Sequence, residues 1–331
     1  LRGLQLFAEK YYEGTPAKAM VKAINVMMFK AEGELIRRHP EFEMQDRLLL
    51  DKVNPEKGTV TIDGTEYAMN TMEFPTVDWS DSYRMTPEER EVMDDLKRSF
   101  CESPQLHRHI EFLYAVGGVY LKMNDNLLFH GCVPLNEDGQ MAEVNFFGQF
   151  MRGKSYFEFC EKAARLAFNT GEARYVDFMF YLWGGPKSPM CGRVVKTFER
   201  SYLDDKSSWK EPQDPYYLYL DSEATSRMIL REFGLKSDLS HIINGHTPVH
   251  VSDGEIPIKA GGKLIVIDGG FSRAYQKQTG IAGYTLISNS RGMLLSAHQP
   301  FESKQRAVSE ELDIHSETEI IHTHPFRLRI K

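Results

Sequence analysis

Leu128-Phe129-His130-Gly131-Cys132-Val133-Pro134 is the stretch of this sequence that decides the fold, and Ile243-Asn244-Gly245-His246-Thr247-Pro248 repeats its pattern much later in the chain. In each stretch a histidine lies beside a glycine, directly after a short apolar run. Such a run predicts a buried strand whose end carries the histidine into a cleft. Two neutral imidazoles are natural ligands of a divalent metal ion, although two alone do not complete a coordination sphere. The alternative, that both are structural histidines bonded to carbonyl groups, stays open from these residues alone.

The composition is that of a globular protein and excludes several classes of function. The chain has 331 residues with 41% hydrophobic and 26% charged side chains, a formal charge of −7 and a pI near 5.9. This acidic balance argues against a dedicated nucleic-acid binder. No apolar run approaches the length of a membrane span, and no signal-peptide pattern opens the chain, so we expect no membrane partner and a cytoplasmic location. The four cysteines are widely spaced, which predicts reduced, mostly buried thiols.

The first part of the chain, residues 1–115, is expected to be a helical segment with one small hairpin at 59–69. Thr15-Pro16 begins a helix that ends near His39-Pro40, and Thr86-Pro87 with Glu89 forms the pattern of a capping box. Asp63-Gly64 between two alternating segments predicts the hairpin turn. The chain opens at Leu1 with apolar residues already at helical spacing and no preceding cap, so we expect it to be a piece of a longer protein.

From Gly117-Gly118 onward short apolar runs alternate with helical patterns, which predicts an α+β unit over residues 116–300 followed by a polar tail at 301–331. The strands are expected at 119–121, 127–129, 144–151, 241–244, 263–268, 284–288 and 293–297. The helices are expected at 155–168, 175–182 and 222–233.

Two further segments have residues suited to binding a phosphorylated ligand. The loop from Gly184 to Arg193 places Lys187 and Arg193 among glycines and prolines, a pattern that favours phosphate recognition, although an ordinary solvated loop would look the same. It is not a Walker A loop. In Val266-Ile267-Asp268-Gly269-Gly270-Phe271-Ser272-Arg273-Ala274-Tyr275, a strand breaks into a diglycine turn. Asp268, Ser272, Arg273 and Tyr275 would then lie at its carboxyl end, where α/β sheets bind ligands, unless the turn is only structural.

The two histidine stretches, Tyr181-Leu182-Trp183-Gly184-Gly185-Pro186-Lys187-Ser188-Pro189 and the segment from Val266 to Tyr284 together resemble class III fructose-1,6-bisphosphatase, the bacterial type. The likeness runs from about residue 20 to residue 300. That family is similar to the calcineurin-like metallophosphoesterases, so the resemblance implies the C-terminal half of an αββα β-sandwich, preceded by a helical segment. Pro248 replaces the second histidine of the Gly-His-x-His form of other metallophosphoesterases.

The resemblance implies that His130 and His246 bind one metal of a Mn²⁺ or Mg²⁺ pair. Two metals would bind the substrate phosphate and activate water for in-line attack, releasing phosphate and fructose 6-phosphate from a sugar bisphosphate. Lys187, Arg193, Asp268, Ser272, Arg273 and Tyr275 are the candidates for contacting the substrate. A homo-oligomer is also expected.

The resemblance also marks what this sequence lacks. The Asp-x-His, Gly-Asp-x-x-Asp-Arg-Gly and Gly-Asn-His-Asp motifs of the family lie upstream of the matching region and would supply the bridging aspartate, the other ligands and the acid that protonates the leaving group. None of them precedes His130 here, so no catalytic residue is assigned and the isolated chain is expected to be inactive. Two alternatives remain: a non-catalytic scaffold that keeps the histidine stretches, and a phosphatase acting on phosphoproteins.

Overall fold

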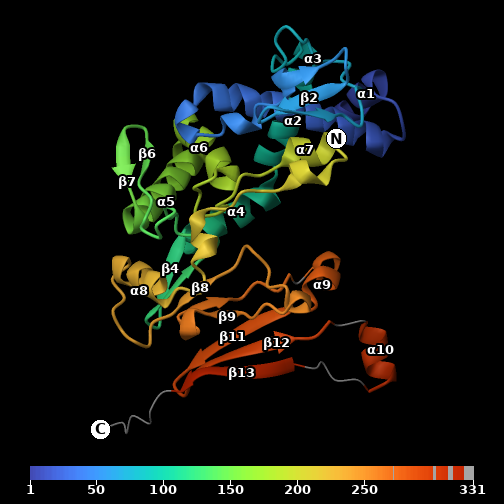
Figure 1. Ribbon diagram of the computed structural model, residues 1–331. Coiled ribbons are helices and arrows are strands. Elements are labelled where there is room, and N and C mark those ends of the chain that lie inside the picture. The colour runs from blue at the N-terminus through green and yellow to red at the C-terminus, as the bar shows by residue number, and fades with distance from the viewer. Residues whose placement is uncertain (271, 301–302, 312–315, 324–331) are drawn as a thin grey trace.

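The structure is a computed structural model that describes residues 1–270, 272–300, 303–311 and 316–323. Helices α1 (Arg2–Tyr11), α2 (Pro16–Arg38) and α3 (Pro87–Cys101) lie at the opposite end of the molecule from the C-terminal sheets, and α4 (Pro104–Val116), α5 (Gly153–Thr170) and α6 (Ala173–Gly184) lie between them (Figure 1). Short 3₁₀ helices complete the connections: η1 (Pro40–Phe42), η2 (Gln45–Arg47), η3 (Leu50–Lys52), η4 (Lys206–Trp209), η5 (Pro215–Leu218), η6 (Val251–Asp253) and η7 (Ala260–Gly262).

The N-terminal part is helical with one small sheet, as the sequence predicts. Its elements are α1 (Arg2–Tyr11), α2 (Pro16–Arg38), β1 (Val53–Asn54), β2 (Thr59–Ile62), β3 (Thr65–Ala68), α3 (Pro87–Cys101) and α4 (Pro104–Val116). The capping box is confirmed, because Thr86 accepts from the Glu89 backbone while Glu89 accepts from the Thr86 backbone. Asp63 and Gly64 both have positive φ, +49° and +79°, as a tight hairpin turn requires.

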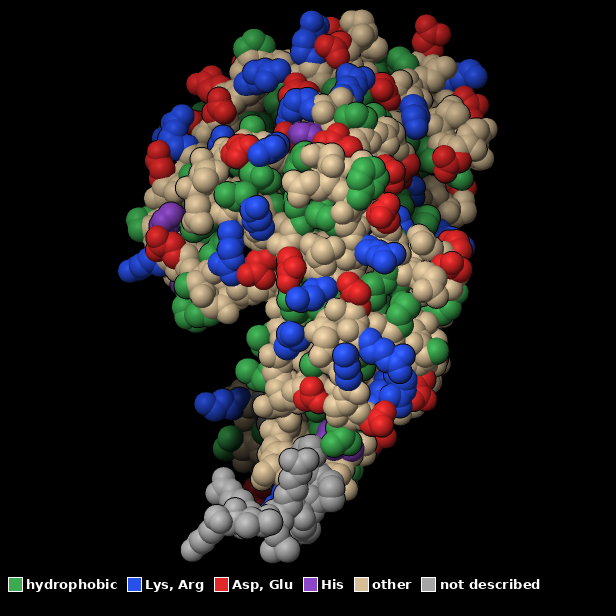
Figure 2. Space-filling model, turned by 90° about the vertical axis from the view of Figure 1, so that its left-hand side faces the viewer, with side chains coloured by type: hydrophobic (Ala, Val, Ile, Leu, Met, Phe, Trp, Pro, Cys, Tyr) green, Lys and Arg blue, Asp and Glu red, His purple; other side chains and the backbone are tan. Residues whose placement is uncertain are grey.

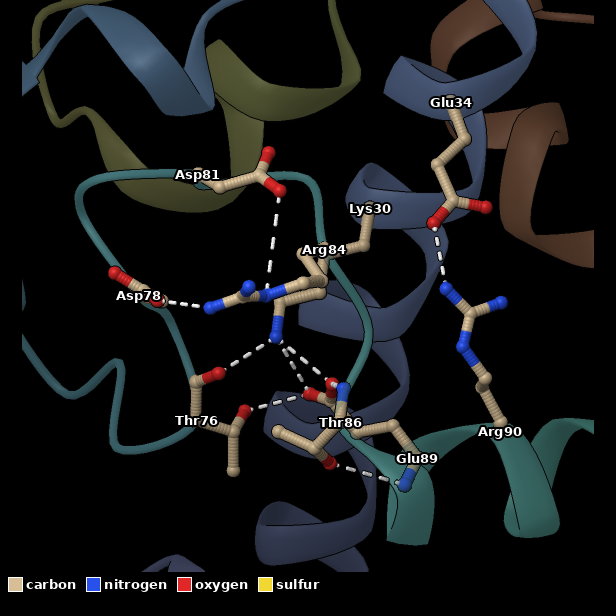
Figure 3. Close-up of polar contacts among 9 residues, drawn as sticks. All are labelled: Lys30, Glu34, Thr76, Asp78, Asp81, Arg84, Thr86, Glu89 and Arg90. Atoms are coloured by element: carbon tan, nitrogen blue, oxygen red, sulfur yellow. Dashed lines mark hydrogen bonds and ion pairs between the residues drawn. The ribbon is translucent and has the colours of Figure 1, made fainter.

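A buried ion pair joins α2 to α3 (Figure 3). Lys30 Nζ lies 2.8 Å from a carboxylate oxygen of Glu89, and both side chains are fully buried. Lys30 also donates to the carbonyl oxygen of Thr76 at 2.6 Å, and the Thr76 hydroxyl donates to Glu89 at 2.6 Å. Because every charged partner is matched, this network fixes the position of α3 on α2 without leaving a buried charge unpaired.

The middle of the molecule packs two helices and a hairpin around aromatic side chains. Its elements are β6 (Val144–Phe146), β7 (Gln149–Met151), α5 (Gly153–Thr170) and α6 (Ala173–Gly184), whereas the following helix α7 (Thr197–Tyr202) adds Phe198 and Tyr202 to the N-terminal core. Phe146 and Phe178 meet edge-on at 5.1 Å, inside a cluster that also receives Phe42 from the N-terminal part. The N-terminal and middle parts therefore share a core.

The five-stranded sheet that carries both histidine stretches has the order β4-β5-β8-β10-β9. Its strands are β4 (Tyr120–Met123), β5 (Asn126–Phe129), β8 (Ile242–Asn244), β9 (Ile258–Lys259) and β10 (Leu264–Val266), with α8 (Glu223–Glu232) before β8. The three central strands β5, β8 and β10 are parallel, and the two edge strands are antiparallel to their neighbours. The central strands are apolar because they are buried on both faces.

A second, antiparallel sheet has the order β11-β12-β13 and packs on the same core. It consists of β11 (Gly283–Asn289), β12 (Gly292–His298) and β13 (Ser316–Thr323), with α9 (Arg273–Thr279) before it and α10 (Lys304–Ser309) between β12 and β13. Ile242 and Leu264 of the first sheet share one cluster with Met293 and Leu295 of the second. The α+β class is confirmed. The described part of the segment expected as a tail contributes β13, so residue 300 is not a break in this sheet.

The surface carries charges of both signs, and one side is hollowed between the helical and the sheet-bearing parts (Figure 2). Three cysteines are buried and Cys101 is exposed, and all four are free thiols, as expected. Among the described residues no helix is both long and apolar enough to cross a membrane.

Candidate metal and phosphate site

Three side chains follow the parallel strands at one edge of the five-stranded sheet. His130 follows β5, His246 lies two residues after β8, and Asp268 lies two residues after β10. Backbone hydrogen bonds hold these strand ends together, since Gly245 N donates to His130 O at 2.9 Å and Val249 N donates to Asp268 O at 2.8 Å. The carboxyl ends of parallel strands meet at one edge, and this brings residues far apart in the sequence into one site.

The two histidines face each other directly. Nε2 of His130 lies 3.0 Å from Nδ1 of His246, with the ring centroids 4.8 Å apart and the planes at 64°. The backbone of His246 has φ +68°, in the left-handed region that a residue with a side chain rarely adopts. Strained backbone of this kind concentrates at functional sites.

The surroundings of both imidazoles favour the neutral form, because the pKa of each is lowered. Partial burial lowers the pKa of His130, while the Asp268 carboxylate opposes this. Burial, then the charges of Arg193 and His130, lower the pKa of His246 to about 4, and Asp268 again opposes the shift. Neutral imidazole is the form that binds a metal ion.

The geometry of the pair fits one shared metal ion. Two ligand atoms in neighbouring positions of an octahedron are about 3 Å apart for metal–ligand bonds of about 2.1 Å. The observed 3.0 Å between the two facing nitrogens is a hydrogen-bond distance, and it also equals that spacing. The described residues contain no group of three or more histidine, cysteine, aspartate or glutamate side chains arranged to hold a metal ion. The pair therefore suits part of a coordination sphere, with further ligands needed.

The loop between α6 and α7 packs against the first histidine stretch. The backbone nitrogens of Gly131 and Cys132 both donate to Pro189 O, at 3.1 and 3.2 Å. A Cβ on Gly131 would lie 2.7 Å from Pro189 O, so only glycine allows this approach. The sequence did not show that this loop and His130 are neighbours, because their contact is made by backbone atoms.

Arg193 is the loop residue that the structure brings to the histidine pair. Its Nη2 donates to the Thr247 hydroxyl at 2.8 Å, and its Nη1 lies 3.6 Å from Glu211. The buried Nε of Arg193 has no hydrogen-bond partner among the described residues. A charged guanidinium beside His246 is suited to contact an anionic ligand.

Lys187 has a different neighbour. Its Nζ lies 3.9 Å from Oδ2 of Asp214, whose side chain is almost fully buried. Oδ1 of Asp214 accepts from the backbone nitrogens of Leu135 and Tyr216, at 3.0 and 2.9 Å. Burial raises the pKa of Asp214 in spite of these bonds. Asp214 and Glu211 lie in a polar stretch without a motif that marks them, so the sequence did not predict their contacts with Lys187 and Arg193.

Of the other residues expected to contact the substrate, the structure brings only Asp268 close to the histidine pair among the described side chains. Asp268 is beside the histidines, and its carboxylate accepts from Gly270 N at 3.0 Å. Ser272 is the N-cap of α9 and Tyr275 is 53% exposed on that helix. Neither side chain bonds to the histidine pair in the described part of the chain. Arg273 begins α9, and its side chain lies outside the described residues.

Two residues close to His246 in the sequence bond to groups other than the imidazoles. Asn244 donates to Gly131 O and to the Tyr216 hydroxyl rather than to an imidazole, and Thr247 pairs with Arg193. Asn244 therefore ties β8 to the first histidine stretch. One Asp-x-His triplet does occur, Asp313-Ile314-His315, but it follows the histidine stretches and lies outside the described residues.

Comparison with known proteins gives one family and several close relatives. The family model described as Firmicute fructose-1,6-bisphosphatase matches residues 7–331. A protein named fructose-1,6-bisphosphatase class 3 from Clostridium acetobutylicum is 50% identical over 317 residues, which are 94% of this chain and 48% of the relative. One of the same name from Clostridium novyi is 51% identical, with the same coverage.

The chain thus spans about half the length of the curated relatives that it matches. No solved structure matches it. Since the family model covers nearly the whole chain, with the histidine pair and Arg193 inside the match, this chain belongs to the Firmicute fructose-1,6-bisphosphatase family.

Proposed function

We propose that this chain supplies one side of a metal-dependent centre that hydrolyses fructose 1,6-bisphosphate to fructose 6-phosphate and phosphate. The observation that carries the proposal is the 3.0 Å approach of His130 Nε2 to His246 Nδ1 at the carboxyl ends of parallel strands, in a chain of this family. Two sheets that share one core support a metallophosphoesterase-like sandwich, of which this chain is one half.

In this proposal His130 and His246 bind one ion of a Mn²⁺ or Mg²⁺ pair. Such ions act as Lewis acids on a phosphoryl group and on water. The lowered pKa values keep both imidazoles unprotonated and ready to bind at neutral pH. Asp268 places a negative charge beside both rings, which would offset the positive charge of the bound ion.

Arg193 and Lys187 would neutralise substrate phosphates. Arg193 is held by Thr247 directly beside His246, so it would meet the phosphate at the metal. Lys187 lies on the same loop as Arg193, and its Nζ is 3.9 Å from the carboxylate of Asp214. We propose that Ser272, Arg273 and Tyr275 line the sugar side of the pocket, because α9 begins just after Asp268.

The test joins this chain, in a single polypeptide, to the part of the Clostridium acetobutylicum relative that it does not match. Phosphate release from fructose 1,6-bisphosphate is measured with and without Mn²⁺. We expect manganese-dependent release by the joined chain and none by the 331-residue chain alone. His130→Ala or His246→Ala should lower the rate roughly 100-fold or more, since loss of even a supporting residue costs up to about 100-fold.

His250→Ala is the matched control, a histidine in the same loop region that pairs only with Asp253 among the described residues. It should keep the rate of the parent. Manganese-dependent release by the 331-residue chain alone would contradict the half-site, and release from a phosphoprotein but not from the sugar would contradict the substrate.

A further inference from the structure

Helix α4 has two apolar faces, and only one is covered. Leu106, Ile110 and Tyr114 are partly buried, and Tyr114 stacks on Phe168 of α5 at 4.5 Å. On the other face Phe112, Leu113 and Val116 are 64%, 57% and 67% exposed. No residue of α4 is fully buried, and none belongs to a core cluster among the described residues. A helix in a folded protein normally turns such a face toward a partner.

Strand β4 follows α4 in the chain (Figure 1) and also carries exposed apolar side chains. Leu121 and Met123 lie on one face of the strand and are 49% and 55% exposed. Within the described residues β4 pairs only with β5, so its outer edge has unpaired backbone groups. Scattered exposed apolar residues are ordinary, but an apolar cluster beside an open strand edge marks a surface that another chain segment covers.

A cavity of about 600 Å³ lies between β4 and α5. Tyr120, Leu121 and Lys122 of β4 form one wall, and α5 forms the other with both acidic and basic side chains, among them Glu158 and Lys162. Mixed charge around an apolar floor suits a polypeptide segment better than a small anion. Adding a strand to an open sheet edge is a common way for polypeptides to associate.

This surface leads to the incomplete metal site. Tyr120 pairs with Phe129, so the first residue of β4 lies at the same edge of the sheet as His130. A polypeptide on this surface would reach the edge where His130, His246 and Asp268 lie without enough ligands for a metal among the described residues.

We infer that Phe112, Leu113, Val116, Leu121 and Met123, which we call the α4–β4 face, form the docking surface for the half of the family's polypeptide that this chain does not match. The relatives are about twice as long as the matched segment, which supplies an occupant of sufficient size. This inference rests on the proposed function, since both require a second half that completes the site.

Thiol labelling tests the inference without depending on activity. Cys101 is the exposed native thiol among the described residues, so Cys101→Ser provides the background. Leu113→Cys and Leu121→Cys are introduced singly into the 331-residue chain and into the joined chain. Val308→Cys, at a position 74% exposed on α10, is the control.

We expect a maleimide to label both new thiols rapidly in the 331-residue chain and at least about tenfold more slowly in the joined chain, because labelling then requires local opening. The control should react equally in both. Equal labelling of Leu121→Cys and Leu113→Cys in the two chains would overturn the inference. Slow, concentration-dependent labelling in the 331-residue chain would also overturn it, because a second copy would then cover the face.

The outcomes separate this inference from the proposed function. Protection of the α4–β4 face in a joined chain that releases no phosphate would leave the docking surface standing and defeat the function. If the joined chain releases phosphate but the thiols on its α4–β4 face are labelled rapidly, the proposed function would stand and the docking surface would be overturned.

Discussion

At the scale of single residues, the backbone of His246 is the most unusual feature of the site. Its φ of +68° points the ring toward His130, and the same conformation is unfavourable for any residue with a Cβ. The strain is consistent with a residue that is placed for binding rather than for stability.

This strain can be measured by comparing two truncations of His246. Both His246→Gly and His246→Ala remove the imidazole, but only glycine adopts positive φ freely. We expect the free energy of unfolding of the glycine variant to exceed that of the alanine variant by about 1–2 kcal/mol. Chemical denaturation measures the difference, and an alanine variant as stable as the glycine variant would contradict the left-handed backbone.

The buried pair Lys30–Glu89 should matter far more for stability than a surface pair nearby (Figure 3). Lys30→Met leaves the Glu89 carboxylate buried without its cation and should cost about 3–5 kcal/mol. Arg90, which pairs with Glu34 at 3.1 Å, is 54% exposed, and Arg90→Met should cost at most about 1 kcal/mol. Similar losses for both substitutions in denaturant titrations would show that Glu89 is not enclosed as described.

His241 gives the fold a dependence on pH at the end of the sheet opposite the site. Its Nδ1 lies 2.6 Å from Gly262 O and its Nε2 lies 3.1 Å from His322, and burial is the main cause that lowers its pKa. Because the folded state binds this proton less readily than the unfolded state, its contribution to stability is full above the ordinary histidine pKa of about 6.5 and is lost as pH falls below it.

We therefore expect the free energy of unfolding to fall between pH 8 and pH 5.5, and to fall less steeply for His241→Asn, whose amide can keep the bond to Gly262. Parallel slopes for the two proteins would show that His241 does not contribute.

At the scale of elements, the strands and helices were largely predictable, because each is encoded by local pattern. The apolar runs before His130 and His246 became β5 and β8, and the Thr86 capping box opens α3. The pairing of β13 with β12 was not predictable, since β13 is exposed along most of its length and has no apolar pattern. The contact of Arg193 with Thr247 likewise depends on where two loops meet in space.

Helix α2 contains a glycine whose role lies in packing between elements. A Cβ on Gly33 would lie 1.9 Å from the Tyr83 ring, which is nearly fully buried against α2. Glycine in the middle of a helix normally costs stability, so alanine usually improves it by about 0.5–1 kcal/mol. Here we expect Gly33→Ala to destabilise the protein, because the rigid ring has to move.

Gly3 in α1 is the matched control. Its Cβ would meet only the end of Asp95, at 3.4 Å, so Gly3→Ala should be neutral or stabilising. Thermal unfolding of both variants decides the matter, and a rise in melting temperature for Gly33→Ala would show that Tyr83 does not pack on α2 in this way.

At the scale of the whole molecule, the chain spans about half of its relatives' length and combines a histidine pair with exposed apolar side chains on α4 and β4. His130, His246 and Asp268 meet at one sheet edge, and β4, which carries part of the α4–β4 face, begins at that same edge. The sequence predicted the histidine pair and the family, because both depend on motifs. The sequence did not predict that one apolar face of α4 is exposed. An apolar helical pattern indicates that a helix face packs against something, but it does not identify the packing partner.

The most direct test of the central claim, that His130 and His246 bind one metal ion, is pulsed EPR of Mn²⁺ bound to the joined chain. Coupling to ¹⁴N reports imidazole nitrogens bound to the ion. The account predicts that His130→Ala and His246→Ala each lose one such nitrogen relative to the parent, and that His250→Ala loses none. A bound ion whose spectrum shows no imidazole nitrogen, or one that neither substitution changes, would contradict it.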